Sequence, residues 1–504
     1  MQKRMIAILL AACTIITCLV GCSSDNNENI QQPVTESTTI KQTDNSNFKL
    51  SYTQADSLDP FKATTQNNQV LASLVFESLF DIDENYEITP NIATGYAFTD
   101  NKTLRVDINP QLKFSDGSKI STEDVAYSIR AALKSEAYGS TLGCISSVEE
   151  NGGSVIIRLN YENPYAVNLL TFPISSVNDD EDGFPIGSGR YKYQTTDEGK
   201  TVLTANKEND FNPYITTIPL LNIASSDSID NAVNIGNISY AFRDLSEDTS
   251  KRFACAKKAI DINNLIYIGI NGKSGITSNA QIRHAISLAV DRSIIAESAY
   301  SGYATAAESM FNPNFKSIEN VKLFSAESDL ATAKQTVTQS GYSNDYLKLT
   351  ILINYNDNRL AAASLIKSQL EAAGFSVTID QQNFGNYTDR IEHGNFDLYI
   401  GEVKLSNDMS LYPFFDENGG TRYGIDNENN TCDDFYKSFL SGDEELGKFI
   451  LSFNEEMPFI PLVYKKGMIC YSKALHGDMQ GYYGNFFSNI DDWNFSIDAA
   501  DNTD

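Results

Sequence analysis

The chain has 504 residues, with 66 acidic against 38 basic side chains and a formal net charge of −28 at pH 7. This acidic balance argues against nucleic acid as a partner, because phosphates are also negatively charged. A chain of this length buries enough apolar surface for two or more domains, each with its own core.

The first residues predict export and a lipid anchor. Two basic residues, Lys3 and Arg4, precede an apolar run over residues 5–20. The run is too short to span a bilayer with ordinary flanks, so we expect a signal peptide over residues 1–21. It ends in Leu-Val-Gly-Cys22, which resembles the bacterial lipobox and implies that Cys22 carries the lipid. An ordinary signal peptide with an incidental cysteine is the alternative.

Residues 22–47 contain almost nothing that could be buried. We therefore expect a flexible tether there, with the folded body beginning near Phe48. Removal of the signal takes away two basic residues and no acid, so the mature charge is about −30.

Besides the lipid-bearing Cys22, the mature chain keeps four cysteines, namely Cys144, Cys255, Cys432 and Cys470. They are too few for a disulfide scaffold in so long a chain and have no metal-binding spacing. One or two bridges and buried free thiols both remain open.

The first half of the body is predicted to consist mainly of antiparallel strands. Alternating apolar residues predict a strand over residues 103–108, and Asp116-Gly117 predicts a turn. Ser121 and Asp124 resemble a capping box that opens a helix with Val125, Ile129 and Leu133 on one face. Hairpins are predicted around the turns at residues 151–153 and 197–199.

The second half changes to alternating strands and helices. An apolar strand over residues 265–271 precedes a helix opened at Ser278. A strand over 347–353, a helix over 358–373, a glycine cap at Gly374 and a strand over 375–379 predict a right-handed βαβ crossover with parallel pairing. Further strands are expected over residues 396–400, after a short helix, and over residues 459–464, where the chain would return to the first half.

Several motifs occur in a fixed order between about Ser57 and Tyr471. They are Ser57-Leu-Asp-Pro60, Phe76-Glu-Ser-Leu-Phe80, Ile88-Thr-Pro-Asn-Ile-Ala93, Leu112-Lys-Phe-Ser-Asp-Gly117, Glu123-Asp-Val-Ala-Tyr-Ser128, Pro185-Ile-Gly-Ser-Gly-Arg-Tyr191, Ile282-Arg-His-Ala-Ile-Ser-Leu-Ala-Val-Asp-Arg292 and the βαβ unit ending Ala373-Gly-Phe375. In this order the set resembles the peptide and nickel class of extracellular solute-binding proteins, family 5 of the ABC importers.

The resemblance implies an α/β, two-lobed periplasmic-binding-protein-like fold (type II, large peptide-binding class), with mixed sheets and an extra subdomain in lobe I. We accordingly expect lobe I over 48–268, an inserted subdomain at about 75–180, lobe II over 269–460 and a return to lobe I over 461–504. The lobes would close around a small-molecule or short-peptide ligand and deliver it to ABC permease subunits. We expect a monomer that contacts the membrane through its lipid only, on the outer face of a Gram-positive cell.

The resemblance also suggests where ligand binds. In many peptide binders of this family, the strand after the βαβ unit leads to a tryptophan and then to an aspartate that pairs with the ligand's ammonium. Residues 397–411 occupy that place without a tryptophan, since the only one in the chain is Trp493. The acid could be Glu402 or Asp408, whereas Lys404 could hold an anionic group. All three could equally be solvated loop charges.

Six further residues are candidates for ligand binding. Gln66 and Asn67 follow the segment with which family members contact ligand, although helix capping explains them equally well. Tyr387 and Tyr399 are candidate walls of the cleft or core residues. Phe311 and Asn314 complete the set.

We expect no catalytic site, metal site or cofactor. His284, His393 and His476 are far apart and form no HExxH motif. The acidic loop at residues 178–183 resembles the start of an EF-hand, but its twelfth position is Gly189 and not glutamate. Gly187-Ser-Gly189 is predicted to be a turn entering a strand at Arg190.

Three alternatives to peptide import remain. The same fold could serve a peptide-pheromone or other signal-sensing or adhesion lipoprotein. It could also bind nickel or another solute. A secreted hydrolase is the most distant alternative, because the two carboxylates of a glycosidase leave no recognisable sequence motif.

Overall fold

The computed structural model describes residues 42–43, 45–245, 253–318, 320–416, 419–426 and 431–497. The predicted signal peptide, Cys22 and the tether up to residue 41 lie outside these residues and stay predictions. Strand pairing already begins at Gln42, opposite Ile497, which is earlier than the boundary expected near Phe48. Within the described ranges, no helix has both the length and the apolar character needed to cross a bilayer.

An antiparallel sheet in the first half has the strand order β5-β6-β8-β7. Its strands are β5 (Ala93–Asp100), β6 (Thr103–Ile108), β7 (Ile145–Asn151) and β8 (Ser154–Leu159). Helix α2 (Thr122–Ala132) packs on it, and its apolar face joins strand residues such as Val106 and Ile157 in a core that we call the hairpin cluster. The predicted strand, hairpin and capping box are confirmed here.

A second sheet has the order β2-β11-β10-β9 and packs against α1 (Gln66–Val75). Its strands are β2 (Leu50–Tyr52), β9 (Tyr191–Thr195), β10 (Thr201–Ala205) and β11 (Thr217–Asn222). The hairpin of β9 and β10 is confirmed, but β2 runs parallel to β11, which the sequence did not predict. Phe48, Leu74, Tyr240 and Trp493 belong to its core, which we call the α1 cluster.

Two small sheets and one helix complete this part of the chain. The small sheets contain β3 (Phe80–Ile82) with β4 (Ile88–Pro90), and β1 (Gln42–Thr43) with β20 (Asn494–Ile497) and β19 (Leu475–His476). Helix α3 (Ser226–Asn234) lies beside β12 (Tyr240–Arg243). Ile229, Val233, Met468 and Cys470 form part of a small core that we call the α3 cluster.

The largest sheet is mixed and has the order β12-β18-β13-β17-β15-β16, with β14 (Ala304–Ala306) paired to β18. Its remaining strands are β13 (Ala256–Ile270), β15 (Lys348–Asn354), β16 (Ser376–Gln382), β17 (Leu398–Lys404) and β18 (Phe459–Tyr471). Strands β15 and β16 are parallel and flank α7 (Asp357–Ala373), which ends at Gly374 with φ 111°. The predicted βαβ unit is therefore confirmed.

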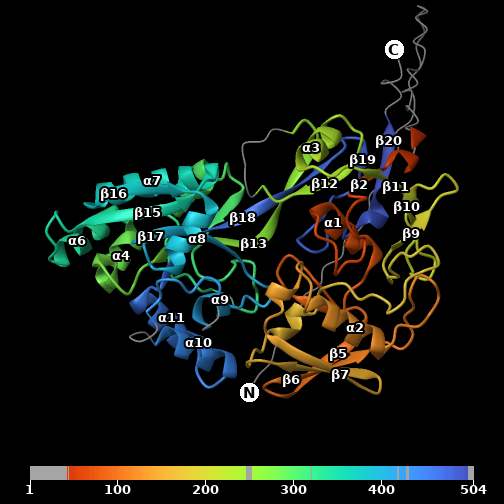
Figure 1. The fold of residues 1–504 in the computed structure, drawn as a ribbon, viewed down its shortest axis with the longest axis horizontal. Coiled ribbons are helices and arrows are strands. Elements are labelled where there is room, and N and C mark those ends of the chain that lie inside the picture. Colours follow the sequence, from red (N-terminus) through yellow and green to blue (C-terminus); the bar gives the residue numbers. More distant parts are fainter. Residues whose placement is uncertain are drawn as a thin grey trace, which may run out of the picture. The chain divides into compact units, whose positions relative to one another are not determined.

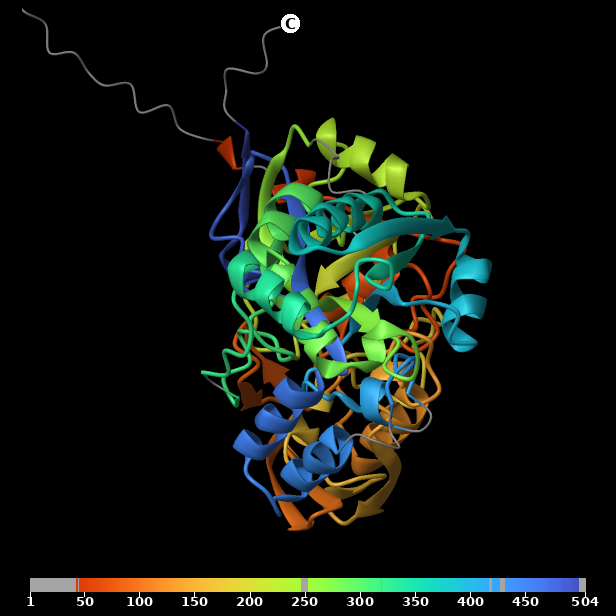
Figure 2. The same cartoon turned by 90° about the vertical axis from the view of Figure 1, so that its left-hand side faces the viewer.

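The other helices cover this sheet or follow it. They are α4 (Ala280–Ala289), α5 (Arg292–Ile294), α6 (Leu330–Gln339), α8 (Phe384–Glu392), α9 (Tyr412–Phe415), α10 (Cys432–Ser441) and α11 (Leu446–Glu456). With the sheet they form the crossover cluster, which contains Ile268, Ile286 and Ile366. Figures 1 and 2 both place α10 near the hairpin sheet, where the Tyr165 and Phe439 rings lie 6.4 Å apart.

Strands β13 and β18 run antiparallel and connect the core clusters (Figure 1). In β13, Ile260 and Ile262 belong to the α1 cluster, whereas residues 265–268 and Ile270 belong to the crossover cluster. The sequence predicted only the apolar half of each strand. The missed halves contain Lys257 and Lys258 in one strand and Lys465 and Lys466 in the other, and such charges resemble a loop when no partner strand is known.

Candidate functional site

A cavity of about 1130 Å³ lies where segments of three core clusters meet. Its described walls come from α1 and the residues after it, from loops at residues 138–142, 171–173 and 209–214, from residues 404–407 at the end of β17, and from residues 482–488 near the C-terminus. The polar and aromatic lining includes Ser73, Glu77, Asp81, Arg190, Lys404, Tyr482 and Tyr483. Segments far apart in the sequence thus converge on one site.

The turn Gly187-Ser-Gly189 joins two walls of this cavity. A Cβ at Gly187 would lie 2.0 Å from the Val75 carbonyl oxygen, and one at Gly189 would lie 2.5 Å from the Val75 carbonyl carbon. Gly189 donates its N–H to that same oxygen at 2.9 Å. Only glycine permits so close an approach to the end of α1, which brings Arg190 into the same wall as Glu77. The segment enters β9 at Tyr191, one residue later than predicted, through a bend at Gly189 and Arg190.

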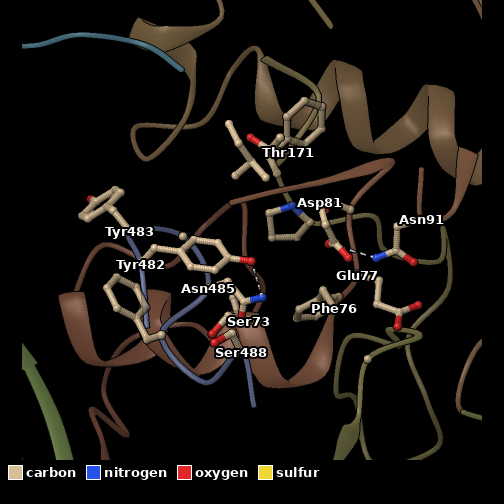
Figure 3. Close-up of a pocket in the computed structure, with 18 of the residues that line it drawn as sticks. Ser73, Phe76, Glu77, Asp81, Asn91, Thr171, Tyr482, Tyr483, Asn485 and Ser488 are labelled. Atoms are coloured by element: carbon tan, nitrogen blue, oxygen red, sulfur yellow. Dashed lines mark hydrogen bonds between the residues drawn. The ribbon is translucent and has the colours of Figure 1, made fainter. Parts of the chain in front are cut away.

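Glu77 and Asp81 make one side of the cavity acidic, opposite Tyr482 and Tyr483 (Figure 3). Asn209 Nδ2 donates to Glu77 Oε1 at 3.0 Å, and Asn91 Nδ2 donates to Asp81 Oδ1 at 3.1 Å. Burial raises the pKa of both carboxyls, of which Glu77 is half-buried and Asp81 is the more exposed. Among the described residues, no lysine or arginine nitrogen lies within 4.0 Å of either carboxylate.

The described lining of the cavity contains two cations, and each has a partner. Arg190 donates from Nη1 to the Ser488 carbonyl at 2.9 Å and from Nη2 to Asn485 Oδ1 at 3.4 Å. Lys404 Nζ donates to the Tyr483 hydroxyl at 2.6 Å and lies 3.8 Å from the centroid of that ring. The acids of the described lining are Glu77, Asp81, Asp210, Asp491 and Asp492. Carboxylates therefore outnumber cations, and the cavity favours a ligand with a positive group.

Of the nine ligand-binding candidates named from the sequence, the structure brings Lys404 and Gln66 to the cavity. Gln66 is the first residue of α1. Asn67 follows it, but its side chain donates to the Ile223 carbonyl at 2.9 Å and lines a separate small pocket.

Glu402 lies in a buried ion-pair network instead of the cavity wall. Lys465 Nζ lies 2.8 Å from Glu402 Oε1, and Arg359 Nη2 lies 3.3 Å from Oε2. Asn264 Nδ2 also donates to Oε1 at 2.8 Å. Burial alone would raise the pKa of Glu402, but Lys465, Asn264 and Arg359 outweigh it and hold the pKa below its ordinary value. The Glu402 carboxylate is therefore already paired with Lys465 and Arg359.

Asp408 is buried outside the cavity lining. It accepts a hydrogen bond from Asn163 Nδ2 at 2.6 Å and one from the Ser410 N–H at 3.2 Å, and it also pairs with the Ser406 hydroxyl. Burial raises its pKa. The hydrogen bond between Asp408 and Asn163 thus joins residues 397–411 to the part of the chain that forms the hairpin cluster. No local sequence pattern predicts this contact.

The remaining four candidates pack elsewhere. Tyr399 and Tyr387 are buried in the crossover cluster, where Tyr387 donates its hydroxyl to the Ile400 carbonyl at 2.8 Å. Phe311 is buried in the same cluster. Asn314 Nδ2 donates to Asp261 Oδ2 at 2.9 Å. The structure gives each of these side chains a packing or hydrogen-bonding role, and their part in ligand binding stays a prediction.

Sequence reasoning missed Glu77, Asp81, Arg190, Tyr482 and Tyr483 as site residues. Two signals were present. Glu77 and Arg190 each lie inside a motif that carried the family resemblance, where a charge directly follows a buried aromatic or a glycine turn. The two tyrosines lie between Gly481 and Gly484, an aromatic pair in a loop.

The donor set does not suggest a metal centre. Among the described residues, no three or more His, Cys, Asp and Glu side chains are grouped as metal ligands. The described cavity lining contains neither histidine nor cysteine.

Comparison with known proteins gives consistent matches. The family model "Bacterial extracellular solute-binding proteins, family 5 Middle" matches residues 87–422. The nickel-binding protein NikA of Staphylococcus aureus is 24% identical over 323 residues, which are 60% of this chain and 64% of NikA, somewhat under two thirds of that protein. The periplasmic murein peptide-binding protein MppA of Escherichia coli is 25% identical over 402 residues, covering 68% of this chain and 72% of MppA.

The fold agrees as well. The solved structure of MppA, a murein tripeptide binding protein in its unliganded open form, has a TM-score of 0.71 to this chain at 19% identity. The match covers 91% of this chain and 99% of that one. The predicted α/β fold of the periplasmic-binding-protein type, with mixed sheets, is therefore confirmed.

Proposed function

Because the chain belongs to the bacterial extracellular solute-binding proteins of family 5, we propose that it is the substrate-binding component of an ABC importer and holds a short peptide or peptide-like solute. One observation carries this proposal, the cavity of about 1130 Å³ whose walls come from segments of three core clusters. Its size is at or above the upper end of the range of about 300–1,000 Å³ for small-molecule sites.

Hinge closure is the mechanism that we propose. The lobes would be residues 48–268 with 461–504 and residues 269–460, with β13 and β18 as the two connecting strands. Leu405 of the crossover cluster and Phe76 of the α1 cluster both line the cavity, so a rotation about these strands would change its width. A ligand that contacts both sides would stabilise the closed state, which a permease could then recognise.

The charges of the cavity suggest the orientation of a peptide. Glu77 and Asp81 would attract the ligand's ammonium group, because no described lysine or arginine nitrogen lies within 4.0 Å of either carboxylate, and Arg190 offsets their charge only in part. Lys404, released from Tyr483, would take its carboxylate. We therefore propose Glu77 and Asp81, in place of Glu402 or Asp408, as the partners of the ligand's ammonium group.

The alternatives are weaker on these grounds. A nickel complex would have to supply its own nitrogen ligands, because the described lining has no histidine. A signalling protein would use the same cavity. It would differ only in the partner protein that recognises the closed, ligand-bound state. A hydrolase has no support from the matched family, whose model describes solute-binding proteins.

We propose the lipid anchor at Cys22 and an extracytoplasmic location from the first residues and the family. The lipid would keep the receptor beside its permease at high local concentration. Mass spectrometry of the N-terminal peptide tests this directly, and an unmodified Cys22 in membrane-purified protein would contradict it.

The function is tested by calorimetry on the full chain in mild detergent, with the tripeptide Ala-Lys-Ala and a pool of tripeptides to pentapeptides. We expect binding of free peptides, at least tenfold weaker binding after N-acetylation, and a smaller loss after C-amidation. Glu77→Gln should abolish the difference in Kd between the free and the N-acetylated peptide. The matched control is Glu198→Gln, at an exposed position, which should keep this difference. No binding of any peptide, together with binding of Ni²⁺-histidine, would replace the peptide by a metal complex.

A further inference from the structure

Two cysteines lie at the end of the β13–β18 pair that is far from the crossover cluster: Cys470 is in β18, and Cys255 is in the bend immediately before β13. In the antiparallel register Lys257 is opposite Cys470, and Cys255 precedes Lys257 by two residues. Cys255 lies one residue before Ala256, the first paired residue of β13, so this register brings it close to Cys470 at the end of the strand pair. Both belong to the α3 cluster, Cys470 as a buried member and Cys255 as a half-buried residue packed against it.

The two thiols differ in exposure and acidity. Their mutual hydrogen bond lowers the pKa of Cys255 to about 7 and raises the pKa of Cys470. Nearby, Arg243 pairs with Asp230 at 2.7 Å, and Lys257 further favours the Cys255 thiolate. A half-exposed thiolate beside a buried thiol is the arrangement in which one sulfur attacks an oxidant and the other resolves the product.

We propose that Cys255 and Cys470 form a redox pair that closes to an intrachain disulfide on contact with a small-molecule disulfide such as glutathione disulfide. The Cys255 thiolate attacks one sulfur of the oxidant, which breaks the oxidant's S–S bond and releases one thiol. Cys470 then gives up its proton and attacks Cys255 Sγ in the mixed disulfide, releasing the second thiol. Two protein thiols are oxidised, and one disulfide molecule is reduced to two thiols.

The bond would join the two strands that connect the core clusters. It would enclose about 215 residues, which include all the buried members of the crossover cluster. Closing so long a loop removes much chain entropy from the unfolded state, so the oxidised protein should be the more heat-stable form. For a chain of this size we expect the unfolding midpoint to rise by about 5 °C.

The other cysteines provide the matched controls. Cys144 lies in the hairpin cluster and Cys432 in the crossover cluster, and both are buried and outside any disulfide. Burial raises the pKa of the Cys144 thiol to about 12, and burial also raises that of Cys432. Neither should react at neutral pH in the folded chain.

The experiment treats the full chain, folded and in mild detergent, with glutathione disulfide and then maps peptides without reduction. We expect a cross-linked peptide pair containing Cys255 and Cys470, and loss of the 5 °C rise on addition of dithiothreitol. Cys255→Ser and Cys470→Ser should each abolish the pair and the rise, whereas Cys144→Ser and Cys432→Ser should keep both.

Stable glutathione on Cys255 without transfer to Cys470 in the wild-type chain would overturn the proposal. So would a cross-link that forms only after unfolding in urea. Both readouts come from the wild-type protein, so the test stands even if a serine variant folds poorly.

Discussion

Glu402 and Lys404 lie two residues apart on β17, yet their surroundings give them different roles. Lys404 reaches the cavity and its ammonium bonds Tyr483, whereas Glu402 neutralises Lys465, which is only 2% exposed. A buried ammonium is costly unless a carboxylate pairs with it. At this scale the same sequence segment serves both a ligand site and the stability of the sheet.

Glu402→Gln should leave Lys465 and Arg359 buried without their counter-charge. We expect the free energy of unfolding to fall by about 3–5 kcal/mol, measured by urea denaturation. The control is Glu198→Gln, which breaks an exposed pair with Lys200 and should leave the urea midpoint unchanged. A loss below about 1 kcal/mol would mean that Glu402 is not the partner on which these cations depend.

Glu402 should also make the stability of the folded chain decrease in acid. Its pKa in the folded chain is below the ordinary value of 4.5, despite the opposing effect of burial. The ion pair therefore stabilises the fold above about pH 4.5, and this contribution is lost as pH falls through the lowered folded pKa. Between about pH 5 and pH 3 the wild type should lose more stability than Glu402→Gln does, and equal losses would contradict this assignment.

At the scale of elements, α2 shows how a local motif supports a core. The Ser121 hydroxyl accepts from the Asp124 N–H at 3.2 Å, and Asp124 Oδ2 accepts from the Ser121 N–H at 3.0 Å. Asp124 Oδ1 also accepts from the Val177 N–H at 3.0 Å. The start of the helix is thereby tied to a distant segment, and Val125 and Ile129 are held in the hairpin cluster.

Ser121→Ala should remove the hydroxyl acceptor while leaving the Asp124 side chain in place. The expected loss is about 1 kcal/mol in the free energy of unfolding, from the unsatisfied N–H at the helix start. Ser364→Ala, on the exposed face of α7, is the control and should change stability by less than about 0.5 kcal/mol. Equal effects of the two substitutions would argue against a capping role.

At the scale of the whole described body, contacts join the chain segment of the hairpin cluster to that of the crossover cluster. The Tyr161 and Tyr412 rings stack with centroids 3.4 Å apart, and Asn407 Nδ2 donates to Thr171 Oγ1 at 2.9 Å. The buried Asp408 with Asn163 lies in the same region. If the lobes close on ligand as proposed, these contacts belong to the closed state and must break on opening.

Tyr161→Ala should therefore weaken ligand binding without disrupting either core. We expect the Kd of a bound peptide to rise about tenfold, because about 1.4 kcal/mol of closed-state contact is lost. Small-angle scattering should show a larger radius of gyration for the unliganded variant than for the wild type. The control is Tyr96→Ala, which removes an aromatic partner of Phe80 within the first half of the body. Unchanged affinity and radius would contradict a role in closure.

The sequence by itself was enough for most of the local structure and for the family. The strand at residues 103–108, the capping box at Ser121 and the βαβ unit ending at Gly374 all rest on residues close together in the chain. Their periodicity and capping depend on neighbours within a few positions, so the pattern is visible without a fold. The order of the motifs along the chain was enough to identify the family for the same reason, because this order can be seen without knowing which residues lie close in space.

Only the tertiary structure decided which residues share the cavity and which charges neutralise each other. Lys465 lies 63 positions from Glu402, and Asn163 lies 245 positions from Asp408, so no spacing rule could assign these pairs. The same applies to Glu77 and Tyr482, which line one cavity from opposite ends of the chain. Sequence alone names groups able to pair, but electrostatic and hydrogen-bond energies depend on distance and burial, which arise only once separate segments pack together.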